Sequence, residues 1–456
     1  MSRQVTVAIA GLGNRGRDVY APFAEMFPEH MKIVAIADPI PERIEEVAER
    51  YHIPLEKCFS SAEEMLEQDK LANAAFITTQ DRQHASQAIK AMEKGYDILL
   101  EKPISPNLKE CRMVAEAAEK YGRNVVVCHV LRYTPFYQEI KRIIDSGTIG
   151  DVVSVMGIMN VGYWHQAHSF VRGNWANSDV TSPMILQKCC HDMDLYLWLT
   201  GKTCRSVSSF GNTYHFKKEN APAGAASRCT KGCKAKKDCI FDAEKIYLTN
   251  EDTGVLAGNV GWPAEVLSSR PDEASIRKAI EEGPYGRCVY DCDNNVVDHQ
   301  IVNMEMTDGA SMSLAMSGFT PDVSRYTKFM GTRGQIIADM GANMITLSRF
   351  GKKEEIIDVS KLAEDFSGHG GGERRMVEAF LDLITGGSHN LCCAFRRKPC
   401  HCACGRVRQN GGKVIYLDET RQEREVACEK CMPKCRKIKQ NPLTNPVKTS
   451  TILCAT

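Results

Sequence analysis

A short apolar run followed directly by three spaced glycines constrains this chain more than any other feature. Residues Val5 to Ala10 are apolar and partly β-branched, which predicts a buried parallel strand. Gly11, Gly13 and Gly16 then follow with G-x-G-x-x-G spacing. A tight turn into a helix needs this spacing if backbone N–H groups are to face a pyrophosphate. The spacing alone is a weak signal, so its value depends on the elements that follow.

The length and charge of the chain limit the classes of protein that it can belong to. Its 456 residues, 43% of them hydrophobic, exceed one ordinary core and predict two domains. The first ten residues lack a signal-peptide pattern, and no apolar run approaches about 18 residues, so we expect a soluble cytoplasmic protein. The formal charge of +1 favours neither a nucleic-acid partner nor a membrane partner.

Polar residues follow each of the next predicted strands. Residues 32–37 lead to Asp38, residues 73–77 to Thr78, and residues 97–100 to Glu101. Because ligands bind outside the carboxyl ends of strands in open α/β sheets, these residues are expected to line one crevice. Asp38 lies 22 residues after Gly16 and suits the ribose hydroxyls of NAD better than the phosphate of NADP. Alternatively, Asp38 caps the helix that follows it.

A further strand at 124–128 completes the pattern, and we place the end of the first domain at residue 128. The predicted cofactor site combines the glycine turn with the polar strand ends and the segments that follow them. Its candidate residues are Gly11, Gly13, Asn14, Arg15, Gly16, Asp38, Thr78, Thr79, Asp81, His84, Glu101 and Lys102.

Several motifs in register resemble the glucose-fructose oxidoreductase, inositol dehydrogenase and MocA (Gfo/Idh/MocA) family. They are GLGNRG, AIADP, TTQDRQH, KGYDILLEKP and a later K-x-x-H-D-x-D run. The resemblance implies an α/β protein: a Rossmann domain with a doubly wound parallel sheet (1–128), then an α/β domain with a large open mixed sheet (129–388). It also implies NAD as cofactor, a carbohydrate or cyclitol substrate, and a homodimer or homotetramer formed through the outer face of the mixed sheet.

The candidate catalytic residues lie in a mixed polar and apolar segment, residues 184–199, that predicts one helix. Lys188, His191 and Asp192 share one side of it, because they are three or four residues apart. Oxidation of an alcohol needs a base with a pKa near 7. We therefore assign His191 as general acid/base and Lys102 as the residue that polarises the hydroxyl, with Lys188 in support. Gln187 stands where many family members carry Asp, so the proton relay can differ; a purely structural histidine is the alternative.

The loop at 162–175 is rich in aromatic and basic residues and predicts part of a substrate wall. Its tryptophans offer flat faces to sugar C–H groups, and its histidines and arginine offer hydrogen-bond donors. An ordinary packed loop is the alternative. The candidate substrate residues are Arg132, Tyr133, Trp164, His165, His168, Arg172, Trp175 and Asp192.

A cysteine-containing insertion at about 220–247 has little apolar material, and a metal ion could organise it. Cys229, Cys233 and Cys239, completed by Cys288 or Cys292, could form a tetrahedral zinc site. The C-x3-C-x5-C spacing is not a standard zinc motif, so free thiols are the alternative.

Two later segments are less regular. Residues 298–316 predict a hairpin at Asp308-Gly309, and residues 367–372 predict a flexible loop. We expect His369 to be an exposed residue of this loop; the alternative is that it lines the site. Residues 389–456 are rich in Cys and Arg, and we expect a poorly ordered tail. They form either a basic metal-binding appendage or the product of a disturbed reading frame, since 411–419 still resembles the end of the family.

Three functions fit these predictions. The first is an NAD-dependent oxidoreductase that acts on a secondary hydroxyl of a sugar, glycoside or inositol. The second is a glycoside-cleaving enzyme that uses NAD for transient oxidation and elimination. The third is a non-catalytic sensor of sugar or NAD, which the presence of both Lys102 and His191 disfavours.

Overall fold

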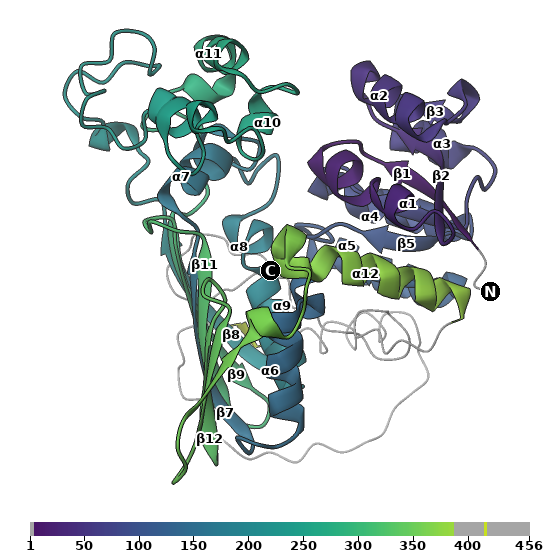
Figure 1. Cartoon of the computed structure of the whole chain (residues 1–456), viewed down its shortest axis with the longest axis vertical. Helices are drawn as coiled ribbons and strands as arrows, with labels where there is room; N and C mark the ends of the chain where they lie inside the picture. The colour runs from purple at the N-terminus through teal and green to yellow at the C-terminus, as the bar shows by residue number, and fades with distance from the viewer. Residues whose placement is uncertain (1–3, 387–414, 417–456) are drawn as a thin grey trace, which may run out of the picture.

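The computed structural model describes residues 4–386 and 415–416, and it contains two sheets (Figure 1). The first sheet has six strands, all parallel, in the order β3-β2-β1-β4-β5-β6. The strands are β1 (Val5–Ala10), β2 (Met31–Ala37), β3 (Cys58–Phe59), β4 (Ala74–Ile77), β5 (Asp97–Leu100) and β6 (Val125–Val127). This order confirms the predicted Rossmann fold.

Helices cover both faces of this sheet. One face packs on α3 (Ala62–Glu67), α4 (Asp81–Glu93) and α5 (Leu108–Tyr121). The other packs on η1 (Asn14–Tyr20), α1 (Phe23–Met26) and α2 (Pro41–Tyr51).

The long helix α12 (Ser367–Thr385) also joins the core of the first domain, although it follows the second sheet in sequence. The ring of Phe380 lies 5.8 Å from that of Phe76 in β4, and Met376 and Val377 are buried in the same cluster. Figure 1 shows α12 running along the first domain from the junction with the second. The two domains therefore share this helix.

The second sheet has nine strands in the order β14-β13-β12-β11-β7-β10-β9-β8-β15. Among the described strands of this second sheet, only β7 and β10 pair in parallel, so the sheet is mixed, as expected. Its strands are β7 (Val152–Asn160), β8 (Cys204–Asn212), β9 (His299–Met306), β10 (Ser311–Ser317), β11 (Ser324–Gly331), β12 (Gly334–Asp339), β13 (Met344–Arg349), β14 (Glu355–Asp358) and β15 (Ile415–Tyr416). The β9–β10 pair is the hairpin predicted at Asp308-Gly309. Apart from β15, the predicted tail lies outside the described residues.

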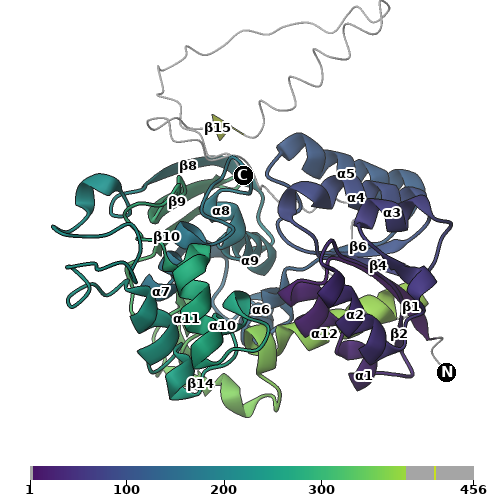
Figure 2. The same ribbon diagram turned by 90° about the horizontal axis from the view of Figure 1, so that it is seen from above.

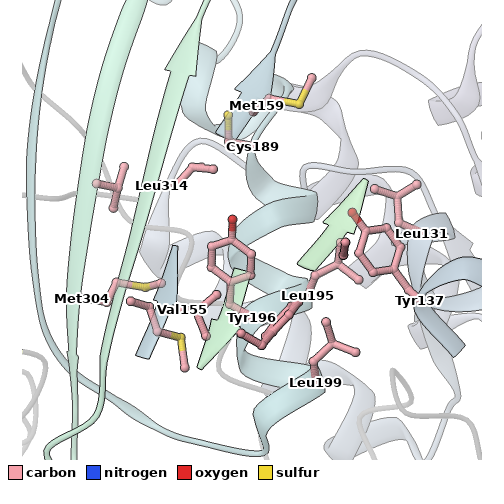
Figure 3. Packing of buried hydrophobic residues seen from close by; sticks show 14 of the residues in the cluster. Leu131, Tyr137, Val155, Met159, Cys189, Leu195, Tyr196, Leu199, Met304 and Leu314 are labelled. Atoms are coloured by element: carbon pink, nitrogen blue, oxygen red, sulfur yellow. The ribbon is translucent and has the colours of Figure 1, made fainter. Parts of the chain in front are cut away.

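One face of this sheet is covered by α6 (Pro135–Asp145) and α9 (Cys190–Thr200). Figure 3 shows Tyr196 and Leu195 of α9 packed beside Val155, Met304 and Leu314 of the strands. The opposite face carries exposed apolar side chains on the four strands β7, β8, β9 and β11. They are Val153, Met156, Ile158, Phe210, Ile301 and Tyr326.

Several of the remaining helical segments form a separate cluster beside one end of this sheet (Figure 2). The cluster includes η4 (Gln166–Arg172), η6 (Lys245–Thr249), α10 (Ala264–Leu267) and α11 (Glu273–Glu282), with α7 (Tyr163–His165) packed against it. The other short helices are η2 (Leu55–Lys57), η3 (Val130–Tyr133), η5 (Lys218–Asn220), η7 (Val255–Ala257), η8 (Pro284–Gly286) and η9 (Val359–Lys361). No helix among residues 4–386 and 415–416 has the length and apolar character needed to cross a membrane.

Two predicted helices are wrong in their continuity. The helix expected over 184–199 is divided into α8 (Met184–Gln187) and α9, with Lys188 and Cys189 between them. The carbonyl of Gln187, which a continuous helix would pair with the N–H of His191, instead accepts from Lys102 Nζ at 2.9 Å. The helix expected directly after the glycine turn is interrupted before Pro22, because proline has no N–H for the preceding turn.

Candidate active site

The glycine turn after β1 leaves open space at one position and is tightly packed at the other two. A Cβ on Gly11, whose φ is +95°, would lie 2.6 Å from the carbonyl oxygen of Thr78. A Cβ on Gly16 would lie 1.9 Å from the carbonyl oxygen of Gly11. No atom lies within 4 Å of a Cβ built on Gly13. This arrangement fits a dinucleotide, whose pyrophosphate needs close approach to the backbone at the middle glycine.

Asp38 at the end of β2 is buried beside the same turn. Its carboxylate accepts hydrogen bonds from the N–H groups of Leu12 at 2.6 Å and Ile40 at 2.9 Å. Nη1 of Arg43 lies 3.6 Å from the carboxylate. The carboxylate is therefore held against the glycine turn, where an adenosine ribose would lie.

The residues after β4 join neighbouring strand ends. The hydroxyl of Thr78 donates to the carbonyls of Ala10 and Gly11, and that of Thr79 donates to Gln87. The ring of His84 lies 2.8 Å from the Pro103 carbonyl and 2.9 Å from the Thr79 carbonyl. Asp81 accepts hydrogen bonds from Ser182 and Gln187 of the second domain. These residues hold the edge of the crevice together.

Arg15 links the glycine turn to two buried carboxylates. Its Nε donates to Glu101 at 2.7 Å and its Nη1 to Glu373 of α12 at 2.6 Å. Tyr20 also donates to Glu101. Burial alone would raise the pKa of Glu101, but Arg15, Lys102 and the Tyr20 hydrogen bond outweigh it and hold that pKa at about 2. Glu101 is therefore a structural anion that orders the cofactor loop.

The predicted catalytic residues converge at the break between α8 and α9. Lys102 is held by its bond to the Gln187 carbonyl. His191 is buried, its ring centroid lies 5.8 Å from that of His129, and its Nδ1 has no hydrogen-bond partner among the described residues. Burial and the charge of Lys102 lower the pKa of His191 well below its ordinary value. The imidazole is therefore neutral near pH 7.

Lys188 lies close to the cations Lys102 and Arg325. Desolvation, with the charges of Arg325 and Lys102, lowers its pKa to about 7. Asp192 does not face the crevice as a free group, because it pairs with Arg325 at 2.9 Å in the interior. The side chain of Lys188 can therefore exchange a proton near neutral pH.

The loop at 162–175 divides between the crevice and the interior. The rings of Trp164 and His165 lie 5.7 Å apart, and the ring of Trp262, just before α10, lies 4.7 Å from that of His165. Burial, followed by the charges of Lys188, His168 and Lys102, lowers the pKa of His165 well below its ordinary value. The sequence did not predict the contact of Trp262 with this loop, because Trp262 lies far from the loop along the chain.

The other predicted substrate residues have partners inside the protein. His168 contacts the Tyr247 hydroxyl at 2.9 Å, and Arg172 donates to the carbonyls of Arg287 and Phe241. Arg132 pairs with Asp194. Trp175 is partly buried against the core under the mixed sheet, and Tyr133 is partly buried against the core of the first domain that includes α12.

The predicted zinc site is not found. Cys229, Cys233, Cys239 and Cys288 line one small cavity beside Arg172. However, no group of three or more His, Cys, Asp or Glu side chains in the described part of the chain is arranged to hold a metal ion. The Cys229 sulfur instead accepts contacts from Arg172 and the Ala243 N–H, and burial raises the thiol pKa of Cys229, Cys239 and Cys288. Packing and hydrogen bonds therefore organise the insertion.

The comparisons with known proteins agree with this geometry. A family model described as "Oxidoreductase family, NAD-binding Rossmann fold" matches residues 5–129, and one described as "GFO/IDH/MocA C-terminal domain" matches residues 137–253. The chain belongs to the GFO/IDH/MocA oxidoreductase family. Membership of this family accounts for the two-sheet architecture and for the cofactor-type glycine turn.

The relatives of this chain include proteins named as oxidoreductases and dehydrogenases. The putative oxidoreductase YteT of Bacillus subtilis is 23% identical over 83% of this chain and 88% of its own length. The scyllo-inositol 2-dehydrogenase (NAD(+)) of the same species is 30% identical over 46% of this chain and 58% of its own length. A levoglucosan dehydrogenase, solved with NADH and levoglucosan, shares the fold with a TM-score of 0.59 at 18% identity, covering 85% of this chain and 92% of that one.

Proposed function

We propose that this protein is an NAD-dependent oxidoreductase acting on a secondary hydroxyl of a sugar, glycoside or cyclitol. The observation that carries the proposal is the group at the α8–α9 break, where a buried histidine with an unpartnered ring nitrogen lies among two lysines. The names of the inositol dehydrogenase and levoglucosan dehydrogenase relatives support the substrate class.

The cofactor residues of this proposal are the glycine turn and the strand ends described above. Bound NAD would supply the acceptor for the hydride that leaves the substrate carbon. Asp38 favours NAD over NADP, because a buried carboxylate repels a 2′-phosphate.

The protein's own groups handle the hydroxyl proton. Lys102, oriented by the Gln187 carbonyl, donates a hydrogen bond to the reacting oxygen and stabilises its developing negative charge. The proton leaves that oxygen for the neutral side chain of His191 and passes on to Lys188, whose pKa of about 7 matches the task. The carbon loses a hydride and the oxygen a proton, so the product is a ketone.

The second part of the proposal is a homodimer or homotetramer. Ile158 of β7, Ile301 of β9 and Phe210 of β8 are each about half exposed on the uncovered face of the mixed sheet. Phe210 pairs with Ile301 across the strands, and Ala315 joins Ile301 to Ile158, so these side chains form a row that a second copy of this chain would bury.

A substrate screen tests this proposed function. The purified protein is incubated with NAD or NADP and a panel of cyclitols, monosaccharides and glycosides, while NADH and carbohydrate products are both measured. We expect NADH formation with a polyol and a strong preference for NAD. Glycoside cleavage without net NADH would support the elimination alternative, and binding without turnover would support a sensor.

A further inference from the structure

Residues 368–371, just before the regular part of α12, have an unusual backbone. Gly368, His369, Gly370 and Gly371 all have positive φ values, between +37° and +79°. His369 is one of three non-glycine residues with positive φ in the described chain, together with His52 and Asn343. A left-handed histidine among glycines is a costly conformation that the surrounding structure must hold in place.

The conformation is held by a carboxylate on the same helix. Nδ1 of His369 lies 2.7 Å from Oε1 of Glu373. A Cβ on Gly368 would lie 1.9 Å from Oε2 of that carboxylate, so a side chain there would displace it. Glu373 also accepts from Arg15 of the glycine turn at 2.6 Å. The carboxylate thus links His369 to the cofactor loop.

His369 faces the group of residues at the α8–α9 break. Its ring centroid lies 6.4 Å from that of His191, with 41° between the planes. About half of the His369 side chain is still accessible, whereas His191 and Glu373 are buried. A hydroxyl-bearing ligand near His191 would therefore reach His369 as well.

We propose that His369 binds a substrate hydroxyl adjacent to the reacting one, and that Glu373 positions it. This inference rests on the proposed function and deepens it. Glu373 is charged, because its bonds to His369 and Arg15 outweigh burial and lower its pKa. Nδ1 of His369 therefore carries the proton, and Nε2 keeps a lone pair that accepts from a hydroxyl. The ligand class is a vicinal diol within a polyol ring.

The test compares two matched variants of the full-length protein loaded with NAD. His369→Asn removes the imidazole but keeps a residue that tolerates positive φ, and His52→Asn makes the same change at the exposed left-handed end of α2. With a substrate from the screen, we expect His369→Asn to raise KM about tenfold or more, the effect of one lost hydrogen bond. The Kd of NADH and the melting temperature should stay near wild type.

Glu373→Gln tests the positioning role. The Glu373→Gln variant should have a KM between those of the wild type and His369→Asn. The double variant should have the same KM as His369→Asn alone. If the wild type turns over a polyol but His369→Asn keeps its KM and kcat, the dyad is overturned while the proposed function stands. If the wild type oxidises nothing in the panel, both fall.

Discussion

The surroundings of Lys188 give the strongest indication of a proton-transfer group in this site. Burial removes the Lys188 amine from water, the charges of Arg325 and Lys102 act on it, and Asp192 is paired with Arg325 in the interior. A lysine kept among cations loses its proton more easily than a lysine in water. A buried lysine with a lowered pKa destabilises the fold at pH values where the same lysine in the unfolded chain is protonated. A catalytic role accounts best for the presence of Lys188 at this position.

Replacing Lys188 by Met therefore separates activity from stability. We expect kcat to fall about a hundredfold or more, the usual contribution of a proton-transfer group. The melting temperature at pH 7 should be equal or higher, because a strained ammonium is replaced by an apolar side chain of similar length. Steady-state kinetics and a thermal melt check both effects. A large loss of stability would contradict this account of Lys188.

The lowered pKa of Lys188 also predicts a pH profile. Below a pKa of about 7 the amine is protonated and cannot take a proton, so oxidation should rise with pH through about 7. The reverse reduction should fall over the same range. Folding stability should increase with pH between about 7 and the ordinary lysine value, because the unfolded chain binds the extra proton there. A profile of kcat/KM in both directions tests this, and a flat profile would exclude Lys188.

Asp38→Ser tests the choice of cofactor. The change removes the carboxylate that faces the ribose site and frees Arg43, now 3.6 Å from it, to meet a 2′-phosphate. We expect the Kd of NADH to rise about tenfold and that of NADPH to fall, as measured by fluorescence titration. An unchanged ratio of the two constants would show that Asp38 only supports the backbone of Leu12 and Ile40.

At the scale of elements, local sequence patterns located the strands well and the helix ends less well. The strand predicted at residues 5–10 is β1, and the turn predicted at Asp308-Gly309 joins β9 to β10, since an apolar run, alternation and a left-handed glycine are local signals. The division between α8 and α9 had no local signal. It depends on Lys102, a residue 85 positions away that competes for the Gln187 carbonyl.

The close contact between β7 and α9 gives a prediction at this scale. A Cβ on Gly157 would lie 1.6 Å from the hydroxyl oxygen of Tyr196. Gly157→Ala should therefore lower the free energy of unfolding by about 1–3 kcal/mol through overpacking. Tyr196→Phe removes that oxygen and should rescue part of the loss in the double variant. Denaturant unfolding of all four proteins measures the coupling; purely additive losses would contradict the contact.

At the scale of the whole molecule, the resemblance of the motifs predicted the two sheets. It did not predict that Trp262 joins the aromatic wall, or that Glu265 accepts from Asn14 at 2.9 Å. Both belong to a segment whose sequence lacks regular periodicity. His369 was expected to be an exposed turn residue, and only the return of α12 to the first domain places it near His191.

The uncovered face of the mixed sheet predicts how copies of the chain associate. Ile158→Asp should convert the proposed dimer or tetramer to a monomer, because a carboxylate would be buried at the centre of the interface. Leu55→Asp is the matched control, since Leu55 is 79% exposed on the first domain. Size-exclusion chromatography with light scattering distinguishes them. A monomeric wild type, or an Ile158→Asp variant of unchanged size, would contradict this use of the face.

Under the proposed function, the crevice is a site of net hydride transfer assisted by Lys102. The most direct test uses a carbohydrate from the screen that is deuterated at its hydroxyl-bearing carbons, with mass spectrometry of the nicotinamide product. We predict that the wild type forms NADH carrying one deuterium together with a ketone, and that Lys102→Met forms neither at a comparable rate. Unlabelled NADH, or a cleaved glycoside without labelled NADH, would contradict the central claim.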